Sequence, residues 1–568
     1  MTTSAAGSGL AENQKFPAWL KRHPHWVLTL AVLTLLVPLL NKPFNMDDPL
    51  FIWSAKQIHA HPANPYGFAV NWYGMAMPMW AVTKNPPLTC YYLAGAAALV
   101  GWSEFALHGA FLVPALAVIW GTHRLARQFC NQPMLAALAT LFMPVFLISS
   151  MTVMCDVLML ALWIWAVVLW LEGLQRDDYW QLSLAGLLVG LAALAKYFGI
   201  CLLPLLVTYS LMQKRKLGRW VVCLLIPILM LCVYQWAIWI FYGYELFSDA
   251  ANYAVSFKTT TGESLAANGF TGLAFTGGCL AVTLFLAPWL WRVRRLAALA
   301  LSMTLAAAVF FNVGNYFDHY KLLDRPIQTG VEIQIVLWAI GGGCVLMLTA
   351  AELVNWRDAH AWLLALWVLG TFLFAVFFNW TITGRSLLPI APALGILLAR
   401  RWERFAPGRK SWSLGLVTGL AMSAALAWWA TRADAQFAAD VRKATDRVCA
   451  QYNRTARPLW FQGHWGFQYY MNKHGAAALD FNDAALLPGD YMAIPRNNSN
   501  VTLPNIKKVK TQAFLIIATS RWLTTFDECL GAGFYTSNWG PLPFVLGRVT
   551  PEQVYVCTLR LVPSPNSK

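Results

Sequence analysis

The sequence predicts an all-α polytopic membrane protein that carries a small extracytoplasmic α/β domain at its C-terminus. Of its 568 residues, 58% are hydrophobic and only 12% are charged, whereas a soluble protein carries about 25% charged residues. Apolar stretches long enough to cross about 30 Å of hydrocarbon recur as far as residue 430. Beyond that residue the chain becomes polar, and the pattern changes to short alternating runs that are typical of strands.

About thirteen apolar segments can be placed in order as membrane spans. They cover residues 26–42, 104–121, 134–149, 153–172, 181–196, 198–213, 219–242, 271–291, 296–312, 331–354, 361–379, 384–400 and 411–430. The polar N-terminal residues 1–24 contain Lys21 and Arg22, and no small-residue cleavage site follows them. We therefore expect the first span to be retained and not removed as a signal peptide.

The charge distribution indicates whether the ambiguous apolar run at residues 87–102 crosses the membrane. If this run does not cross the membrane, basic loop residues such as Arg124, Arg127 and Arg215 gather on one side, as the positive-inside rule requires. We therefore expect an interfacial or re-entrant helix at residues 87–102. The N-terminus is then cytoplasmic, and the C-terminal domain lies outside the plasma (inner) membrane. The net charge of +16 is spread over short loops, which argues against a nucleic-acid partner.

We expect a transmembrane domain at residues 1–430, with surface helices in a first large outer loop at residues 43–86. Residues 431–568 form the external α/β domain. There the runs "RPLWFQ", "DYMAIP", "AFLIIAT" and "QVYVCTLRLV" predict strands, and "HWGFQYYMNKHG" predicts a helix. The eleven cysteines show no zinc-binding spacing. The sequence allows one disulfide among Cys449, Cys529 and Cys557, because disulfides form in domains outside the cytoplasm.

Two neighbouring carboxylates, Asp47 and Asp48, follow the first span. Neighbouring residues on a helix do not share a face, so we expect different roles for them. Asp48 precedes Pro49 and is predicted to cap a surface helix, with chemistry as the alternative role. An unpaired carboxylate at a membrane edge is costly, and Asp47 is therefore a candidate for function.

Further ionisable residues stand at the predicted outer ends of spans, among them Asp156, Lys196 and Arg385. A carboxylate can take a proton from an acceptor hydroxyl, and Lys and Arg stabilise a departing phosphate. Such a collection suits chemistry on a phosphorylated lipid. Nucleotide sugars are absent outside the cytoplasm, so an activated donor used there would be carried by the membrane.

Six motifs in order give the chain a resemblance to a known family. They are "DDPLF", "KNPPLTCYYLAG", "SEFALHGAFLVPALAVIWGTHRLARQF", "MTVMCDVLML", "GLLVGLAALAKYFGICLLP" and "GRSLLPIAPAL". The set resembles the GT-C glycosyltransferases related to dolichyl-phosphate-mannose protein mannosyltransferases and to bacterial lipid A aminoarabinose transferases. The resemblance covers residues 26–400 and implies a GT-C fold. It also implies an inverting transferase that uses a polyprenyl-phosphate-linked sugar as donor and a hydroxyl of an envelope lipid, glycan or protein as acceptor.

The resemblance also implies a catalytic set. Asp47 would be the general base on the acceptor, Asp48 would cap the surface helix or touch a metal, and Asp156 would line the same cavity. The second acid of the family motif is usually Glu, where this chain has Asp48. Relatives carry His or Glu at the position of Asn85. Because of these departures, the sequence does not decide whether the protein binds a divalent metal ion. No other cofactor is expected.

The substrate-binding residues that follow from the resemblance are basic, with one amide neighbour. Lys84, next to Asn85, would contact the donor phosphate, and Lys196 and Arg385 would add further phosphate contacts. In the loop "NPYGFAVNWYG", Tyr66 and Trp72 are candidates for stacking on a sugar ring, with an interfacial aromatic belt as the alternative.

Two other functions fit a polytopic membrane protein. A lipid or solute transporter or flippase would place ionisable residues near mid-membrane and show inverted repeats, whereas the acids here stand at predicted span ends and no repeat is visible. A lipid-linked oligosaccharide polymerase or ligase would more naturally use large external loops rich in arginine.

Overall fold

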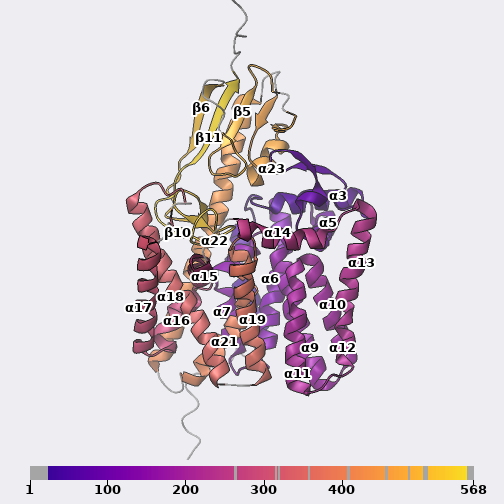
Figure 1. The fold of residues 1–568 in the computed structure, drawn as a ribbon, viewed down its shortest axis with the longest axis vertical. Coiled ribbons are helices and arrows are strands. Elements are labelled where there is room, and N and C mark those ends of the chain that lie inside the picture. The colour runs from indigo at the N-terminus through magenta and orange to yellow at the C-terminus, as the bar shows by residue number, and fades with distance from the viewer. Residues whose placement is uncertain are drawn as a thin grey trace, which may run out of the picture.

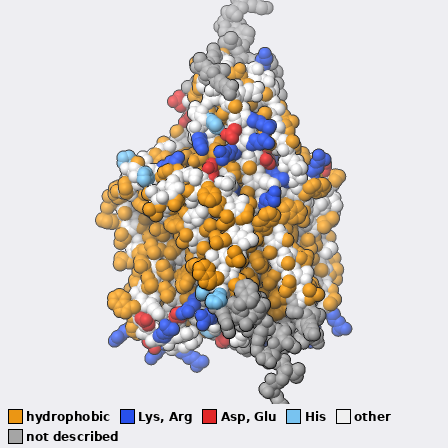
Figure 2. All heavy atoms as spheres, turned by 180° about the vertical axis from the view of Figure 1, so that it is seen from behind, with side chains coloured by type: hydrophobic (Ala, Val, Ile, Leu, Met, Phe, Trp, Pro, Cys, Tyr) orange, Lys and Arg blue, Asp and Glu red, His pale blue; other side chains and the backbone are white. Residues whose placement is uncertain are grey.

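A bundle of helices carries a strand-containing domain at one end (Figure 1). The computed structural model describes residues 23–260, 265–313, 316–317, 320–355, 358–405, 410–453, 458–483, 486–502 and 509–559. We call the end of the bundle beneath the strands the upper face. On the side seen in Figure 2, hydrophobic side chains form a broad band around the middle, with Lys and Arg at the lower end and again near the upper face. This banding is typical of a protein embedded in a bilayer.

The first part of the chain contributes one helix of the bundle and a layer on the upper face. Helix α2 (Pro24–Leu36) continues into a 3-10 turn (Val37–Leu39). The upper layer consists of α3 (Asp48–Ala60), β1 (Ala69–Asn71), β2 (Ala76–Pro78), α4 (Met79–Val82) and α5 (Leu88–Val100). Helices α3 and α5 lie side by side there (Figure 1). Helix α5 has 13 residues, about 20 Å of helix, which is shorter than the hydrocarbon core.

The bundle is built from long helices and from pairs that break in the middle. Its helices are α6 (Glu104–Ala126), α7 (Pro133–Leu141), α8 (Pro144–Ser150), α9 (Cys155–Arg176), α10 (Tyr179–Ala195), α11 (Leu202–Lys214), α12 (Trp220–Cys223), α13 (Leu225–Tyr242), α14 (Leu246–Thr260), α15 (Leu265–Cys279), α16 (Val282–Leu290), α17 (Val293–Val313), α18 (Arg325–Asn355), α19 (Ala359–Leu373), a π turn (Phe374–Phe378), α20 (Gly384–Leu387), α21 (Ile390–Phe405) and α22 (Lys410–Tyr452). Of these, α14 lies on the upper face (Figure 1).

The expected count of about thirteen spans is not confirmed. Among the described residues, seven helices are long and apolar enough to cross a membrane, or up to nine if each bent pair forms one span. The pairs α7–α8 and α15–α16 bend by 64° and 87°. Proline opens α8, and Lys196 ends α10 before a 3-10 turn (Tyr197–Cys201). These breaks shorten the apolar helices, and at α8 the cause is Pro144, because Pro cannot donate a backbone hydrogen bond within a helix.

Small residues bring the helices of the bundle into close contact. A Cβ added to Gly277 of α15 would lie 1.8 Å from the Trp338 carbonyl oxygen of α18, and one added to Gly342 would lie 2.1 Å from the Leu273 carbonyl oxygen. Small side chains at such crossings let helix backbones pack tightly within a membrane. In the apolar stretch of α17, by contrast, only 6% is buried inside the protein, and apolar side chains such as Leu301 and Leu305 are exposed.

The C-terminal domain contains a five-stranded mixed sheet in the order β4-β3-β5-β11-β6. Its strands are β3 (Leu459–Phe461), β4 (Ala477–Ala478), β5 (Tyr491–Pro495), β6 (Val509–Ile517) and β11 (Glu552–Leu559). Strand β3 pairs in parallel with β4 and β5, while β11 pairs antiparallel with β5 and β6. The strands predicted from the four sequence runs are confirmed, as is the predicted helix, which is α23 (Trp465–Lys473).

Two short antiparallel strand pairs accompany the sheet. Strand β7 (Leu523–Thr524) pairs with β10 (Val545–Leu546), and β8 (Phe526–Asp527) pairs with β9 (Ala532–Gly533). Helix α22 has 43 residues and rises from the bundle to the sheet (Figure 1). Residue 431, where we expect the second domain to begin, lies within this helix. Cys449, Cys529 and Cys557 are all free thiols.

Candidate active site

A cavity of about 610 Å³ opens between the upper ends of the helices and the C-terminal domain. The bundle and the upper layer contribute its lower wall and sides, including Asp47, Lys84, Lys196 and Arg385. Segments of the C-terminal domain close the opposite side. The volume is that of a typical small-molecule site.

Asp47 lines this cavity at the start of α3. Met46 before it has φ of +50°, a left-handed conformation that turns the chain sharply just before α3. Asp47 is the N-cap residue of α3, but its side chain makes no capping bond. Its carboxylate oxygen Oδ2 instead accepts a hydrogen bond of 2.8 Å from Nη2 of Arg385, and one third of the side chain is exposed.

Asp48 does not cap α3 as the sequence predicted, because the helix already begins at Asp48 and Asp47 is its N-cap. The Asp48 side chain is fully buried and outside the cavity lining. Its two oxygens accept backbone hydrogen bonds from Asn45 and Val153, each of 3.0 Å. Burial raises the pKa of this carboxyl to about 6, and Lys42 opposes the shift. Asp48 therefore ties the turn before α3 to the segment before α9.

The metal ion that the sequence left open finds no ligand cluster in the described part of the chain. No group of three or more His, Cys, Asp or Glu side chains comes together there. Both oxygens of Asp48 are already used by backbone donors.

Asp156 lies behind the cavity, with 1% of its side chain exposed. It stands in the first turn of α9, where a carboxylate is favourable at a helix N-terminus. Lys196 donates a hydrogen bond of 2.6 Å to Oδ1 of Asp156, and Arg385 approaches Oδ2 at 3.7 Å. Asp156 thus holds two of the cavity's cations in place and does not itself line the cavity.

Lys84 reaches the cavity from the loop after α4. Its ammonium group pairs with Asp249 of α14, donates to the Ala81 carbonyl at 3.0 Å and lies 5.5 Å from the ring centre of Tyr253. The ion pair between Lys84 and Asp249 links the first outer loop to α14, and both segments line the cavity.

Asn85 also lines the cavity, but Tyr66 does not. Tyr66 is buried, and its hydroxyl donates a hydrogen bond of 2.9 Å to the Asn85 carbonyl oxygen. In this structure Tyr66 supports the loop that carries Lys84 and Asn85.

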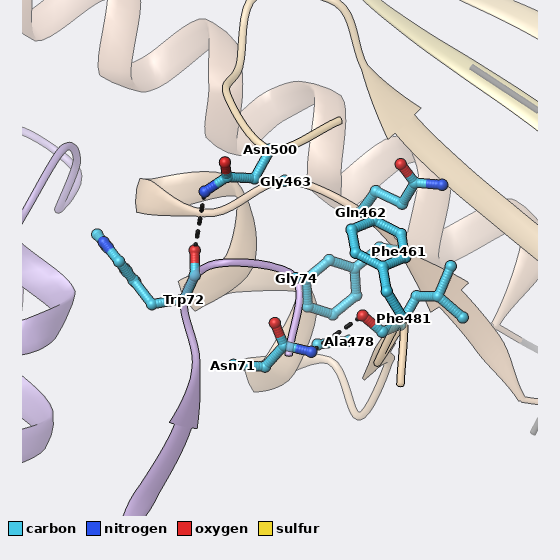
Figure 3. A pocket seen from close by; sticks show the side chains of 10 residues that line it. Asn71, Trp72, Gly74, Phe461, Gln462, Gly463, Ala478, Phe481 and Asn500 are labelled. Atoms are coloured by element: carbon cyan, nitrogen blue, oxygen red, sulfur yellow. Dashed lines mark hydrogen bonds between the residues drawn. The ribbon is translucent and has the colours of Figure 1, made fainter. Parts of the chain in front are cut away.

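Trp72 lines the cavity where the outer loop meets the C-terminal domain. Figure 3 shows this junction, which encloses a second space of only about 10 Å³. Asn71 donates a 2.9 Å hydrogen bond to the Leu479 carbonyl, and Asn500 donates one of 3.2 Å to the Trp72 carbonyl (Figure 3). The loop and the C-terminal domain together close the cavity on this side.

Sequence reasoning missed the contribution of the C-terminal domain to this cavity. His464, Trp465 and Trp539 line it, although all three are more than 400 residues from Asp47 in the chain. It also missed the buried ion pair of 2.6 Å between Lys42 and Asp434, which joins the first helical segment to α22. The only signal in the sequence was an aromatic-rich run near His464 in a polar region.

Each of the three cations at the cavity is paired with a carboxylate. Lys84, Lys196 and Arg385 pair with Asp249, Asp156 and Asp47, respectively. Among the described lining residues, Asp47 is the only carboxylate that reaches the cavity surface. Cations at the surface with carboxylates mostly behind them favour an anionic group in the cavity, because Lys and Arg donors bind phosphate oxygens well.

Residues 84–239 match the family model described as dolichyl-phosphate-mannose-protein mannosyltransferase. The matched range contains Lys84, Asn85, Asp156 and Lys196. No curated protein matches the chain. The family match confirms the resemblance to GT-C glycosyltransferases that the ordered motifs predicted, and the helical bundle with its C-terminal strand domain agrees with it. Together these findings point to a multi-pass membrane glycosyltransferase of the GT-C superfamily.

The solved structures that are similar to the chain include two apo forms. One is the apo crystal structure of ArnT from Cupriavidus metallidurans, at 15% identity and a TM-score of 0.41, covering 84% of this chain and 93% of that one. The other is the apo oligosaccharyltransferase of Archaeoglobus fulgidus, at 12% identity and a TM-score of 0.47, covering 82% of this chain and 66% of that one.

Proposed function

We propose that the protein transfers a sugar from a polyprenyl-phosphate-linked donor to a hydroxyl of a cell-envelope acceptor, with inversion at the anomeric carbon. The observation that carries this proposal is the composition of the cavity surface. Among the described lining residues one carboxylate, Asp47, shares the cavity with the three cations Lys84, Lys196 and Arg385. This is the set that a base-assisted transfer away from a phosphate requires.

The chemical step moves one proton and one electron pair. Asp47 takes the proton of the acceptor hydroxyl while the hydroxyl oxygen forms a bond to the anomeric carbon. The bond from that carbon to the phosphate oxygen breaks on the opposite face, and polyprenyl phosphate leaves with the electron pair. Negative charge thereby passes from Asp47 to the phosphate. Arg385 contacts Asp47 and also approaches the carboxylate that holds Lys196, so it is placed to stabilise the charge in both positions.

The donor's lipid chain has an apolar surface to lie on. Met159, Phe198 and Phe374 line the same cavity and belong to helices or turns of the apolar bundle. If the polyprenyl tail lies on these side chains, the donor phosphate points toward the cations at the upper face. Burial of the chain would supply much of the donor affinity, at roughly 25 cal/mol per Å² of apolar surface.

We propose that the upper face is extracytoplasmic. The support is the bias of loop cations that predicts a cytoplasmic N-terminus, although residues 1–22 themselves lie outside the described range. The transmembrane part at residues 1–430 and the external part at residues 431–568 remain our proposed domains. In this orientation the cavity faces the compartment where membrane-borne donors are used.

The test is release of polyprenyl phosphate by the purified full chain in lipid nanodiscs. The protein is supplied with a panel of polyprenyl-phosphate sugars and with extracted envelope acceptor. Asp47→Asn should abolish release and leave donor binding intact. The matched control is Asp483→Asn, which changes an exposed carboxylate of the C-terminal domain outside the cavity lining and should release at the wild-type rate.

Two outcomes would contradict the proposal. Equal release by wild type and Asp47→Asn would remove Asp47 from the chemistry. No release with any donor, together with protein-dependent movement of the lipid between leaflets, would instead identify a flippase.

A further inference from the structure

The cavity side formed by the C-terminal domain differs chemically from the side formed by the bundle. The C-terminal residues that line it are His464, Trp465, Ser499, Asn500, Thr536, Asn538 and Trp539. None of these described residues carries a formal charge at neutral pH, since burial lowers the pKa of His464 to about 3. The side therefore offers aromatic rings and neutral hydrogen-bonding groups, in contrast to the cations opposite.

The aromatic rings on this side are contiguous. Trp72 of the outer loop lies 4.6 Å from His464, measured between ring centres. His464 lies 4.5 Å from Trp465, which in turn meets Trp539 edge to face at 5.6 Å. We call Trp72, His464, Trp465 and Trp539 the aromatic wall. Contacts this close make one continuous ring surface on the cavity.

His464 adds a neutral imidazole ring to the wall. The residue is 95% buried, with 5% of its surface exposed, and its Nε2 lies 3.1 Å from Oγ of Ser499. Its Nδ1 has no hydrogen-bond partner among the described residues.

The carboxylate base lies between the two sides. On one side Asp47 accepts its hydrogen bond from Arg385. On the other, the turn that carries Asp47 contacts the first residues of α23, because the Gly466 amide donates to the Asn45 side chain at 3.3 Å. A phosphate on the cations and a hydroxyl on the base therefore place the acceptor against the aromatic wall.

We infer that the acceptor is a neutral glycan, and that a sugar ring of this glycan lies on the aromatic wall with its hydroxyl groups bonded to neutral side chains. Sugar rings present C–H faces that pack on Trp and hydroxyls that suit amide, imidazole and hydroxyl partners, which is how largely apolar pockets with few polar groups obtain specificity. The assignment of this ring to the acceptor rests on the proposed transferase function. The binding of a glycan to the aromatic wall does not depend on that function.

The test measures glycan binding without donor. The full chain in nanodiscs is titrated calorimetrically with neutral hexose and N-acetylhexosamine tetrasaccharides. We expect one class to bind the wild type and to bind Trp539→Ala about tenfold more weakly, which corresponds to about 1.4 kcal/mol. Trp539→Phe should recover part of this loss, and His464→Phe, which keeps a ring but removes both nitrogens, should also weaken binding.

The matched control is Trp522→Ala, which removes an exposed tryptophan of the same domain outside the cavity lining and should bind as the wild type does. Thermal midpoints equal to wild type establish that each variant is folded. The inference is overturned if neither tetrasaccharide class binds the wild type, or if Trp522→Ala weakens binding as much as Trp539→Ala does.

The donor assay separates this inference from the proposed function. Release that depends on Asp47, with transfer to a sugar-free peptide or lipid and no glycan binding, would refute the glycan inference and leave the transferase standing. Glycan binding that depends on Trp539, without turnover of any donor, would refute the transferase and leave the sugar-binding wall.

Discussion

Replacing Arg385 by Gln tests how the cavity handles the charge that moves during transfer. Arg385 donates to Asp47 at 2.8 Å and stands 3.7 Å from Asp156. Two unit charges about 4 Å apart attract by about 4 kcal/mol at an effective dielectric constant of 20. Asp47 is one third exposed, so solvent screens that pair, and we expect Arg385→Gln to lower the free energy of unfolding by about 1–2 kcal/mol. The protein should remain folded.

The catalytic effect should be larger than the effect on stability. Removing one donor aimed at a developing charge typically lowers turnover by about 10²–10³-fold. Arg385→Lys keeps the charge but loses the planar fork that reaches two carboxylates, so we expect an intermediate loss of roughly tenfold. The apparent KM for the donor should change less than kcat, because the charge on the phosphate grows only as the bond breaks.

The assay is steady-state release of polyprenyl phosphate, with thermal unfolding as the check on folding. Arg496→Gln is the matched control, since it removes an exposed arginine of the C-terminal domain outside the cavity lining and should leave turnover unchanged. Turnover of Arg385→Gln within about threefold of wild type would refute the reasoning, as would an equal loss in Arg496→Gln.

Three further results are expected. Burial, followed by repulsion from Asp527, raises the pKa of Glu552 to about 8, so the folded domain takes up a proton. Thermal midpoints should therefore fall as the pH rises from about 5 to about 8, and Glu552→Gln should remove this fall; parallel pH profiles for the two proteins would contradict it. Lys42→Met should lower the free energy of unfolding by about 3–5 kcal/mol, because it leaves Asp434 buried without its cation; an unchanged denaturant midpoint would show that the pair does not stabilise the fold. Glycan affinity should stay constant between about pH 5 and about pH 8, because His464 is neutral throughout; calorimetry showing a loss of affinity below about pH 6 would mean that the imidazole titrates.

The classes of structure and four residues of the cavity were predictable from the amino-acid sequence alone. Long apolar runs predict helices in a bilayer because the length and polarity of a segment are local properties. Alternation predicted the strands of the C-terminal domain for the same reason. The predicted residues Asp47, Lys84, Lys196 and Arg385 do line one cavity, since ordered motifs at span ends already place them on the same face.

What each of these groups touches depends on how distant segments pack in three dimensions. Asp48 and Asp156 look like further active carboxylates in the sequence, but packing buries one under backbone donors and sets the other behind Lys196. The aromatic wall joins Trp72 to His464, which are separated by nearly 400 residues and share no local pattern. Such contacts depend on how the outer loop and the C-terminal domain pack over the bundle. Their energies come from pairs of side chains that meet only after folding, so no local signal in either segment specifies them.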